Sequence, residues 1–187
     1  MLKRATQDAK EQDGRAGAVA KLEKRLVGKK LKLDLQDLRK RDFDVKSLDG
    51  QVTVLHFWEY RDTPLEEPYG QVAYLDFLYR KHKKNNVKVI GVNVDRRLRD
   101  PSTRQKAISS AKKLRSFMNL SYPILLDGKG EFRRIGDPRR VGAKLPLFLV
   151  LDRTGKVVQY HIGFYKVDRL RGLEALDKLV SDLAKAK

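Results

Sequence analysis

The feature that most constrains this fold is a set of short apolar segments separated by sequence with helical periodicity. Continuous runs of apolar, β-branched and aromatic residues occupy positions 52–58, 87–95 and 147–151. Runs this short and this continuous are typical of strands that are buried on both faces of a sheet. Since amphipathic segments lie between and after them, we expect an α/β fold whose sheet has helices on both faces.

The remaining segments complete the expected order β-α-β-α-β-(α)-β-β-α, which corresponds to a mixed sheet. A third strand is expected near residues 122–127, and the last two strands form a hairpin around the turn Asp152-Arg153-Thr154-Gly155. The alternating leucines of residues 31–35, and likewise Phe43 and Val45, predict short edge strands. Helices are expected from about residue 64 to residue 84 and over residues 102–118, 131–135 and 167–184.

The chain divides into a short extension and one domain. Residues 1–27 are predicted to form a basic helix with a thin apolar stripe, and Gly28 ends it. Residues 28–187 are long enough for a single packed domain. Neither a signal peptide nor a transmembrane segment is expected from this sequence.

Several segments resemble the TlpA/ResA branch of the thioredoxin-like superfamily, which contains redoxins and thiol-disulfide oxidoreductases. Residues 145–156 (LPLFLVLDRTGK) are similar to that family's cis-proline strand and hairpin. Phe57 and Trp58 resemble the aromatic pair before its active site, and residues 89–95 resemble its second strand. The resemblance covers about residues 26–185 and implies a thioredoxin-like fold, a cis bond before Pro146 and a location outside the cytoplasm.

The chain has no cysteine, although the family carries a Cys-x-x-Cys pair after its aromatic residues. The nearest equivalent here is Asp62-Thr63-Pro64-Leu65. Dithiol chemistry requires thiolates, so we expect a redox-inactive protein that is not an enzyme of this type. Thr63 to Glu66 fits a helix capping box. Asp62 either caps this helix, occupies the anion position at its positive end, or acts with Glu66 or Glu67 as a catalytic carboxylate.

A peptide-binding groove is the leading functional hypothesis. If the bond before Pro146 is cis, the backbone of Leu145 should face the helix start at Asp62. Such a groove binds an extended protein or peptide partner by strand-like pairing, with Trp58 and Tyr60 as lining residues. The alternatives are that Pro146 is only architectural and that Trp58 belongs to the core.

The strongly basic charge supports a second hypothesis. The formal net charge is +18, so an acidic polymer, a nucleic acid or an anionic surface is a possible partner. The best candidate anion-binding residues are Arg96, Arg97, Arg99 and Arg104. A second basic cluster contains Lys129, Arg133, Arg134, Arg139, Arg140 and Lys144. Because no nucleic-acid-binding motif accompanies the charge, a solvated basic surface is the alternative.

No cofactor or metal is expected. The histidines His56, His82 and His161 are far apart in the sequence and show no metal-binding spacing. The sequence also contains no glycine-rich phosphate loop and no G-x-S-x-G motif. The third hypothesis, an enzyme that uses carboxylate chemistry at the same cleft, therefore depends on Asp62, Glu66 and Glu67 alone.

Overall fold

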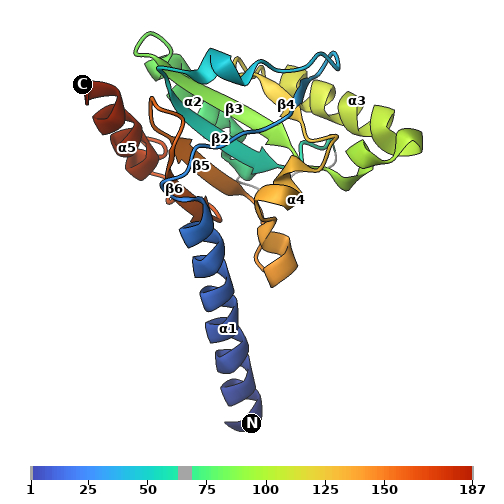
Figure 1. Cartoon of the computed structure of the whole chain (residues 1–187), viewed down its shortest axis with the longest axis vertical. Helices are drawn as coiled ribbons and strands as arrows, with labels where there is room; N and C mark the ends of the chain where they lie inside the picture. The colour runs from blue at the N-terminus through green and yellow to red at the C-terminus, as the bar shows by residue number, and fades with distance from the viewer. Residues whose placement is uncertain (1, 63–68, 187) are drawn as a thin grey trace.

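The computed structural model describes residues 2–62 and 69–186. One mixed sheet runs through the molecule in the strand order β1-β4-β3-β2-β5-β6 (Figure 1). The strands are β1 (Gln36–Asp37), β2 (Val52–Trp58), β3 (Val87–Asn93), β4 (Ile124–Leu126), β5 (Leu147–Leu151) and β6 (Val157–Ile162). Strands β2, β3 and β4 run parallel to one another, whereas β5 is antiparallel to β2 and β6 to β5. The three continuous apolar runs therefore form the adjacent strands at the centre, as the sequence predicts.

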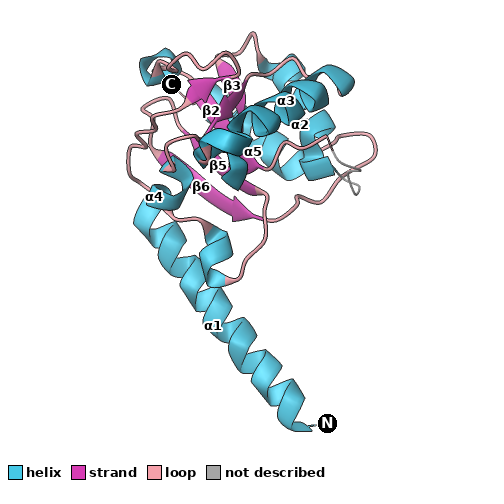
Figure 2. Cartoon of the chain, turned by 90° about the vertical axis from the view of Figure 1, so that its right-hand side faces the viewer, coloured by secondary structure: helices cyan, strands magenta, loops and turns pink. Residues whose placement is uncertain are grey.

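Helices cover both faces of this sheet. They are α1 (Leu2–Leu26), α2 (Val72–His82), α3 (Pro101–Phe117), α4 (Glu131–Ile135) and α5 (Glu174–Lys185). Helices α2, α3 and α5 pack on one face, which is turned toward the viewer in Figure 2. The other face is covered by α4, by the end of α1 and by the segment of residues 31–48. The predicted arrangement of helices on both faces is confirmed.

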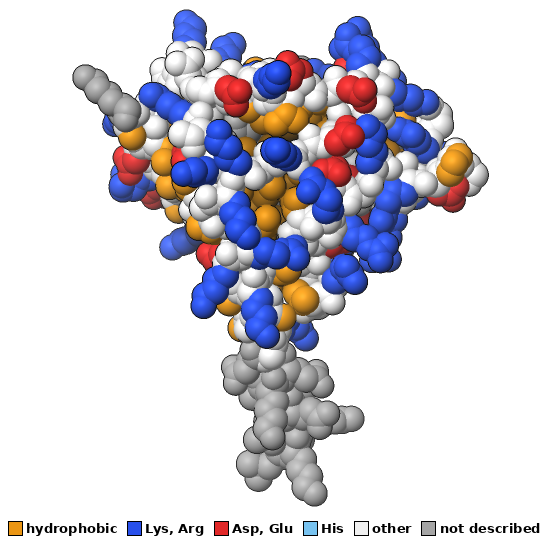
Figure 3. All heavy atoms as spheres, in the orientation of Figure 1, with side chains coloured by type: hydrophobic (Ala, Val, Ile, Leu, Met, Phe, Trp, Pro, Cys, Tyr) orange, Lys and Arg blue, Asp and Glu red, His pale blue; other side chains and the backbone are white. Residues whose placement is uncertain are grey.

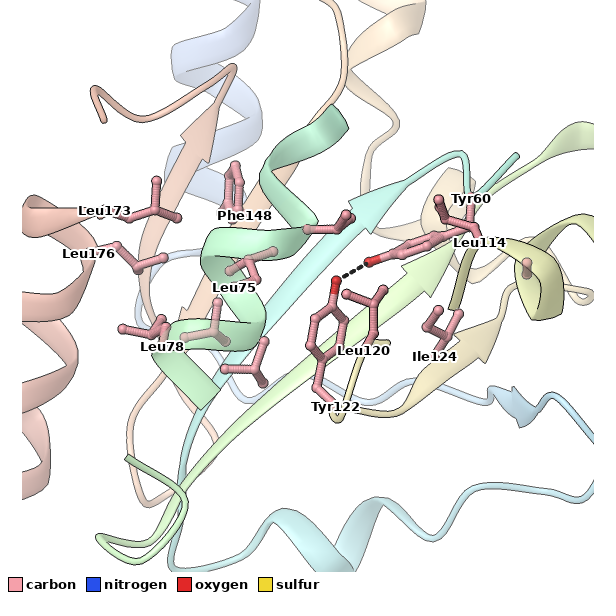
Figure 4. Packing of buried hydrophobic residues seen from close by; sticks show 14 of the residues in the cluster. Tyr60, Leu75, Leu78, Leu114, Leu120, Tyr122, Ile124, Phe148, Leu173 and Leu176 are labelled. Carbon is pink, nitrogen blue, oxygen red and sulfur yellow. Dashed lines mark hydrogen bonds between the residues drawn. The ribbon is translucent and has the colours of Figure 1, made fainter. Parts of the chain in front are cut away.

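Side chains alternate along β2 between two buried clusters, one on each face. Val54 belongs to the same buried cluster as Leu75 of α2 and Leu176 of α5, and Figure 4 labels these two leucines. The neighbouring β2 residues Leu55 and Phe57 point to the other face, where the ring centroids of Phe57 and Phe132 of α4 lie 5.0 Å apart. A strand with apolar residues on both faces is held between two cores, which fixes its register in the middle of the sheet.

Helix α1 projects from the body of the molecule, and only its last turns pack against it (Figures 1 and 2). Leu26 is buried, and Val19 and Leu22 pack against the same cluster. The predicted N-terminal helix is thus confirmed, whereas the domain boundary at residue 28 stays a prediction. None of the described helices is both long and apolar enough to cross a bilayer.

The predicted helix of residues 64–84 is interrupted at Gly70 and Gln71, with its expected start outside the described residues, and the last helix begins later than the sequence predicts. The helix that carries Leu75 starts at Val72, because Gly70 and Gln71 before it have φ angles of 61° and 64° in the left-handed region. The last helix starts at Glu174 instead of residue 167. The Asp168 carboxylate accepts hydrogen bonds from the backbone N–H groups of residues 170 and 171 and holds a turn there.

The expected inner face of the last helix and one edge strand also need correction. Helical periodicity over residues 167–184 predicts Leu170 on the inner, apolar face of this helix, but Leu170 lies in this turn and is 93% exposed. Val45 begins a 3-10 helix (Val45–Leu48) instead of continuing an edge strand. Leu33 and Leu35 are buried as their alternation predicts, yet only Gln36–Asp37 join the sheet in this region, as β1.

Candidate functional site

A cleft of about 360 Å³ lies where β2 ends beside the start of β5. It is lined by Trp58, Glu59, Arg61, Arg139, Ala143, Lys144 and Leu145. The Leu145–Pro146 peptide bond is cis, as the resemblance implies. Two of the predicted groove residues, Trp58 and Leu145, therefore line this cleft, while Pro146 is buried behind it.

The Trp58 side chain belongs both to the cleft and to the core. Its ring lies 6.1 Å from the His56 ring and 6.1 Å from the Phe164 ring, measured between centroids. The backbone of Gly70 covers it so closely that a Cβ there would lie 2.5 Å from a ring carbon. The indole Nε1 atom is buried and has no hydrogen-bond partner among the described residues. The ring is therefore held in place while its exposed edge faces the cleft.

Tyr60 does not line the groove, contrary to the sequence prediction. Its side chain is fully buried, and its hydroxyl oxygen lies 2.8 Å from Nδ1 of His56 and 3.5 Å from the Tyr122 hydroxyl oxygen (Figure 4). Gly91 of β3 makes room for this hydroxyl, since a Cβ there would lie 2.2 Å from it. Burial lowers the pKa of His56 to about 3 and raises the pKa of Tyr60, so both groups stay neutral in the core.

A chain of alternating charges borders the cleft and connects the ends of β2 and β3 to the loop of residues 136–144. Each pair is joined at 2.6 to 3.4 Å, in the order Asp137, Arg139, Glu59, Arg61, Asp95 and Arg97. Burial opposes ionisation of Asp95, but hydrogen bonds from Arg97 outweigh it, and its pKa lies below the ordinary value. The positive and negative groups alternate, so this side of the cleft carries little net charge.

Asp62 lies beside α3. Its carboxylate accepts a hydrogen bond of 2.9 Å from the Ser110 hydroxyl and lies 3.1 Å from Nζ of Lys113. The Ser110 hydrogen bond, followed by Lys113, keeps the pKa of Asp62 below its ordinary value. Thr63, Pro64, Leu65, Glu66 and Glu67 lie outside the described residues.

The predicted anion-binding arginines are divided between internal contacts and solvent. Arg97 is held by Asp95 at 2.6 Å, and Arg104 donates a 2.7 Å hydrogen bond to Gln36. Arg96 and Arg99 are exposed. Basic side chains are spread over the face shown in Figure 3. Anion binding by this cluster stays a prediction.

Three of the six residues of the second basic cluster are paired with carboxylates. Arg139 belongs to the chain of alternating charges that borders the cleft, Arg134 contacts Glu131, and Lys129 contacts Asp34. Sequence reasoning found the basic residues but missed these pairs, because the partners of Arg139 and Lys129 lie 80 and 95 positions away in the sequence.

The three histidines lie in different environments. His56 is in the core, and His161 stacks on Tyr165 with 4.0 Å between the ring centroids. His82 lies at the end of α2, with its Nε2 atom 2.5 Å from an Asp177 oxygen. Among residues 2–62 and 69–186, no group of three acidic or imidazole side chains is arranged to hold a metal ion.

Comparisons with known proteins place these features in context. A sequence profile described as the AhpC/TSA family matches residues 27–160. The thiol-disulfide oxidoreductase ResA of Bacillus thuringiensis (strain Al Hakam) is 28% identical over 157 residues, which are 83% of this chain and 81% of that protein.

Solved structures agree on the fold. A protein from Chlorobium tepidum, described as the thiol:disulfide interchange protein DsbE, superposes with a TM-score of 0.61 at 24% identity, over 84% of this chain and 97% of that one. Peroxiredoxin Q of Xanthomonas campestris gives a TM-score of 0.58 at 19% identity, over 82% and 92%. The predicted α/β thioredoxin-like fold is confirmed.

Proposed function

The chain belongs to the AhpC/TSA family, and we propose that within it this protein is a non-catalytic module that binds an extended peptide segment of a partner protein. The observation that carries the proposal is a retained cleft, with Trp58 and the cis Leu145–Pro146 bond, in a chain without cysteine. A thiolate is the nucleophile in thiol-disulfide exchange, and this chain has none to supply.

The lining of the cleft suits a peptide. Trp58, Ala143 and Leu145 offer apolar surface, while charged groups of both signs surround them. Among the described residues, neither the N–H nor the C=O group of Leu145 has a backbone hydrogen-bond partner. Such groups can pair with an extended chain, and the apolar side chains then select the residues of the ligand.

Carboxylate catalysis at this cleft has less support. A general acid that works near neutral pH needs a raised pKa, but the pKa of Asp62 is lowered by Ser110 and Lys113. In the described part of the chain, burial raises the pKa of the Asp127 carboxyl group. This group, however, accepts hydrogen bonds from the backbone N–H groups of residues 131 and 132 at the start of α4. That role is structural.

The proposal is tested by selecting ligands for the cleft. A cysteine-free random peptide library displayed on phage is panned on the immobilised full chain, and enriched peptides are synthesised. Ala143→Tyr fills the cleft, so it should weaken binding by about tenfold or more. Ala175→Tyr adds the same side chain at an exposed position of α5 and should leave binding unchanged.

Two results would contradict the proposal. One is a failure to enrich any peptide, or equal affinity of the enriched peptides for wild type and Ala143→Tyr. The other concerns redox chemistry: the wild-type chain should not reduce insulin above the uncatalysed rate, and turnover would show that the module is catalytic.

A further inference from the structure

A second and larger groove, of about 670 Å³, lies at the β1–β4 edge of the sheet. One wall is the turn after β1 and the other is the C-terminal end of α3, two segments that Figure 1 shows near each other. The cleft beside Trp58 lies at β2 and β5, and the two sites share no lining residue. The groove is therefore a separate feature.

The turn on the first wall is built around one carboxylate. Asp37 accepts hydrogen bonds from the backbone N–H groups of Arg39 and Arg41 at 2.7 and 3.0 Å, and from Nε of Arg41 at 2.8 Å. These contacts hold the turn that carries both arginines. On the facing wall, Nε of Arg115 donates a 3.4 Å hydrogen bond to the Leu120 carbonyl oxygen. The walls thus present arginines from fixed backbone positions.

The groove has an excess of positive charge. Its four basic side chains are Arg39, Arg41, Lys112 and Arg115, and its one acidic side chain, Asp37, is used inside the turn. In the described part of the chain, no carboxylate lies within 4.0 Å of the basic groups of Arg39, Lys112 or Arg115. This differs from the cleft beside Trp58, where charges alternate and pair. The groove therefore favours a ligand with several negative charges.

The lining also limits the kind of anion. Leu38, Leu120 and Ile124 lie in the floor between the basic walls but are buried, so the half-buried Pro123 offers the accessible apolar surface there. Arginine suits carboxylates because its planar guanidinium can donate two parallel hydrogen bonds. Single-stranded nucleic acids are usually held by aromatic stacking, and no described aromatic side chain lines this groove. A peptide with acidic and apolar side chains meets both requirements.

We propose that this groove binds an acidic segment of a partner protein, with its carboxylates on the arginines of the two walls and an apolar side chain against Pro123. This site lies beyond the proposed function of the Trp58 cleft. A single chain would then hold two parts of a partner, or two partners, at different edges of its sheet.

The experiment uses the full chain and a fluorescein-labelled peptide of repeated Glu-Glu-Leu, read by anisotropy at roughly 150 mM NaCl. The double variant Arg39→Glu with Arg115→Glu should weaken binding by about tenfold or more. The matched control, Lys83→Glu with Lys84→Glu, changes the net charge equally at exposed positions outside the groove. It should weaken binding less than about twofold.

Three comparisons complete the test. A Glu-Glu-Ser peptide should bind more weakly, because it leaves Pro123 uncovered. Ala143→Tyr, which fills the other cleft, should not change the affinity for Glu-Glu-Leu. Oligo-dT and inorganic phosphate should compete poorly.

The proposal is overturned if the Glu-Glu-Leu peptide does not saturate, or if both charge variants weaken it equally. It is also overturned if Ala143→Tyr removes binding, or if oligo-dT binds more tightly than the peptide and depends on Arg39 and Arg115.

Discussion

At the residue scale, the most unusual group is the neutral histidine beneath the cleft. The His56 ring lies 4.8 Å from the Phe148 ring, between centroids, and its Nδ1 atom is paired with the Tyr60 hydroxyl. Burial lowers its pKa from 6.5 to about 3, so the folded protein excludes a proton that the unfolded chain binds below pH 6.5. The contribution of His56 to stability is therefore present above pH 6.5 and is lost as the pH falls toward 3.

This difference predicts an acid-dependent loss of stability. Once the pH is below 6.5, His56 should reduce the free energy of unfolding by about 1.4 kcal/mol for each further pH unit. His56→Gln should remove this slope, which urea denaturation at several pH values would measure. His161→Gln, at a less buried imidazole, should change the slope less. If the free energy of unfolding depended on pH in the same way for wild type and His56→Gln, the folded protein would not hinder protonation of this imidazole, and the prediction would be wrong.

Gly91 gives a second test at this scale. Because a Cβ at this position would lie 2.2 Å from the Tyr60 hydroxyl, Gly91→Ala should displace Tyr60 and destabilise the protein by about 1–3 kcal/mol. Gly14→Ala is the control, since nothing lies within 4 Å of that site in α1, and it should be neutral or stabilising. Thermal unfolding of both variants measures the difference, and equal melting temperatures would refute the tight packing of Tyr60.

At the scale of elements, hydrogen bonds of Gln71 connect the start of α2 to the loop after β6. Its side chain is buried and makes two hydrogen bonds to the backbone of Tyr165, of 2.7 Å to the carbonyl oxygen and 3.0 Å from the N–H group. The neighbouring residue Phe164 touches Trp58, so this contact also supports one side of the cleft. Loss of the amide would leave two backbone groups buried without partners.

Gln71→Met should therefore destabilise the protein by about 2–4 kcal/mol, because each unsatisfied backbone group costs roughly 1–3 kcal/mol. The control is Gln51→Met, which removes one hydrogen bond at an exposed site and should cost well below about 1 kcal/mol. Denaturant titrations compare the two. Similar losses for both variants would mean that the Gln71 contact does not hold these elements together.

The elements also show what the sequence could predict. Strands β2, β3 and β5 could be predicted, because a short continuous apolar run in a chain of this size usually forms a buried strand. The starts of α2 and α5 were not, because they depend on left-handed angles at Gly70 and Gln71 and on the side-chain turn at Asp168. Helical periodicity is insensitive to both features.

The candidate site was only partly predictable for a related reason. Trp58 and Leu145 were found through family resemblance, but the burial of Tyr60 depends on Gly91, a residue of another strand. Arg39 and Arg115 lie far apart in the sequence but line the same second groove, because the strand order of the sheet brings their segments together. Such proximity comes from tertiary structure, which local sequence patterns do not encode.

At the scale of the whole molecule, the fold retains a redoxin scaffold and its cleft without the residues for thiol chemistry. The net charge of +18 is spread over the surface, yet the cleft itself is bordered by charges that alternate in sign. The central claim is that this cleft now serves to bind a peptide.

The most direct test follows the single tryptophan of the chain, which lies in that cleft. In a ¹⁵N-labelled sample, Trp58 gives one indole N–H resonance. Titration with a peptide selected on the full chain should shift this resonance and the Leu145 amide in a saturable way, with the same dissociation constant as anisotropy. Saturable peptide binding that leaves both resonances unmoved would place the binding site elsewhere and contradict the claim.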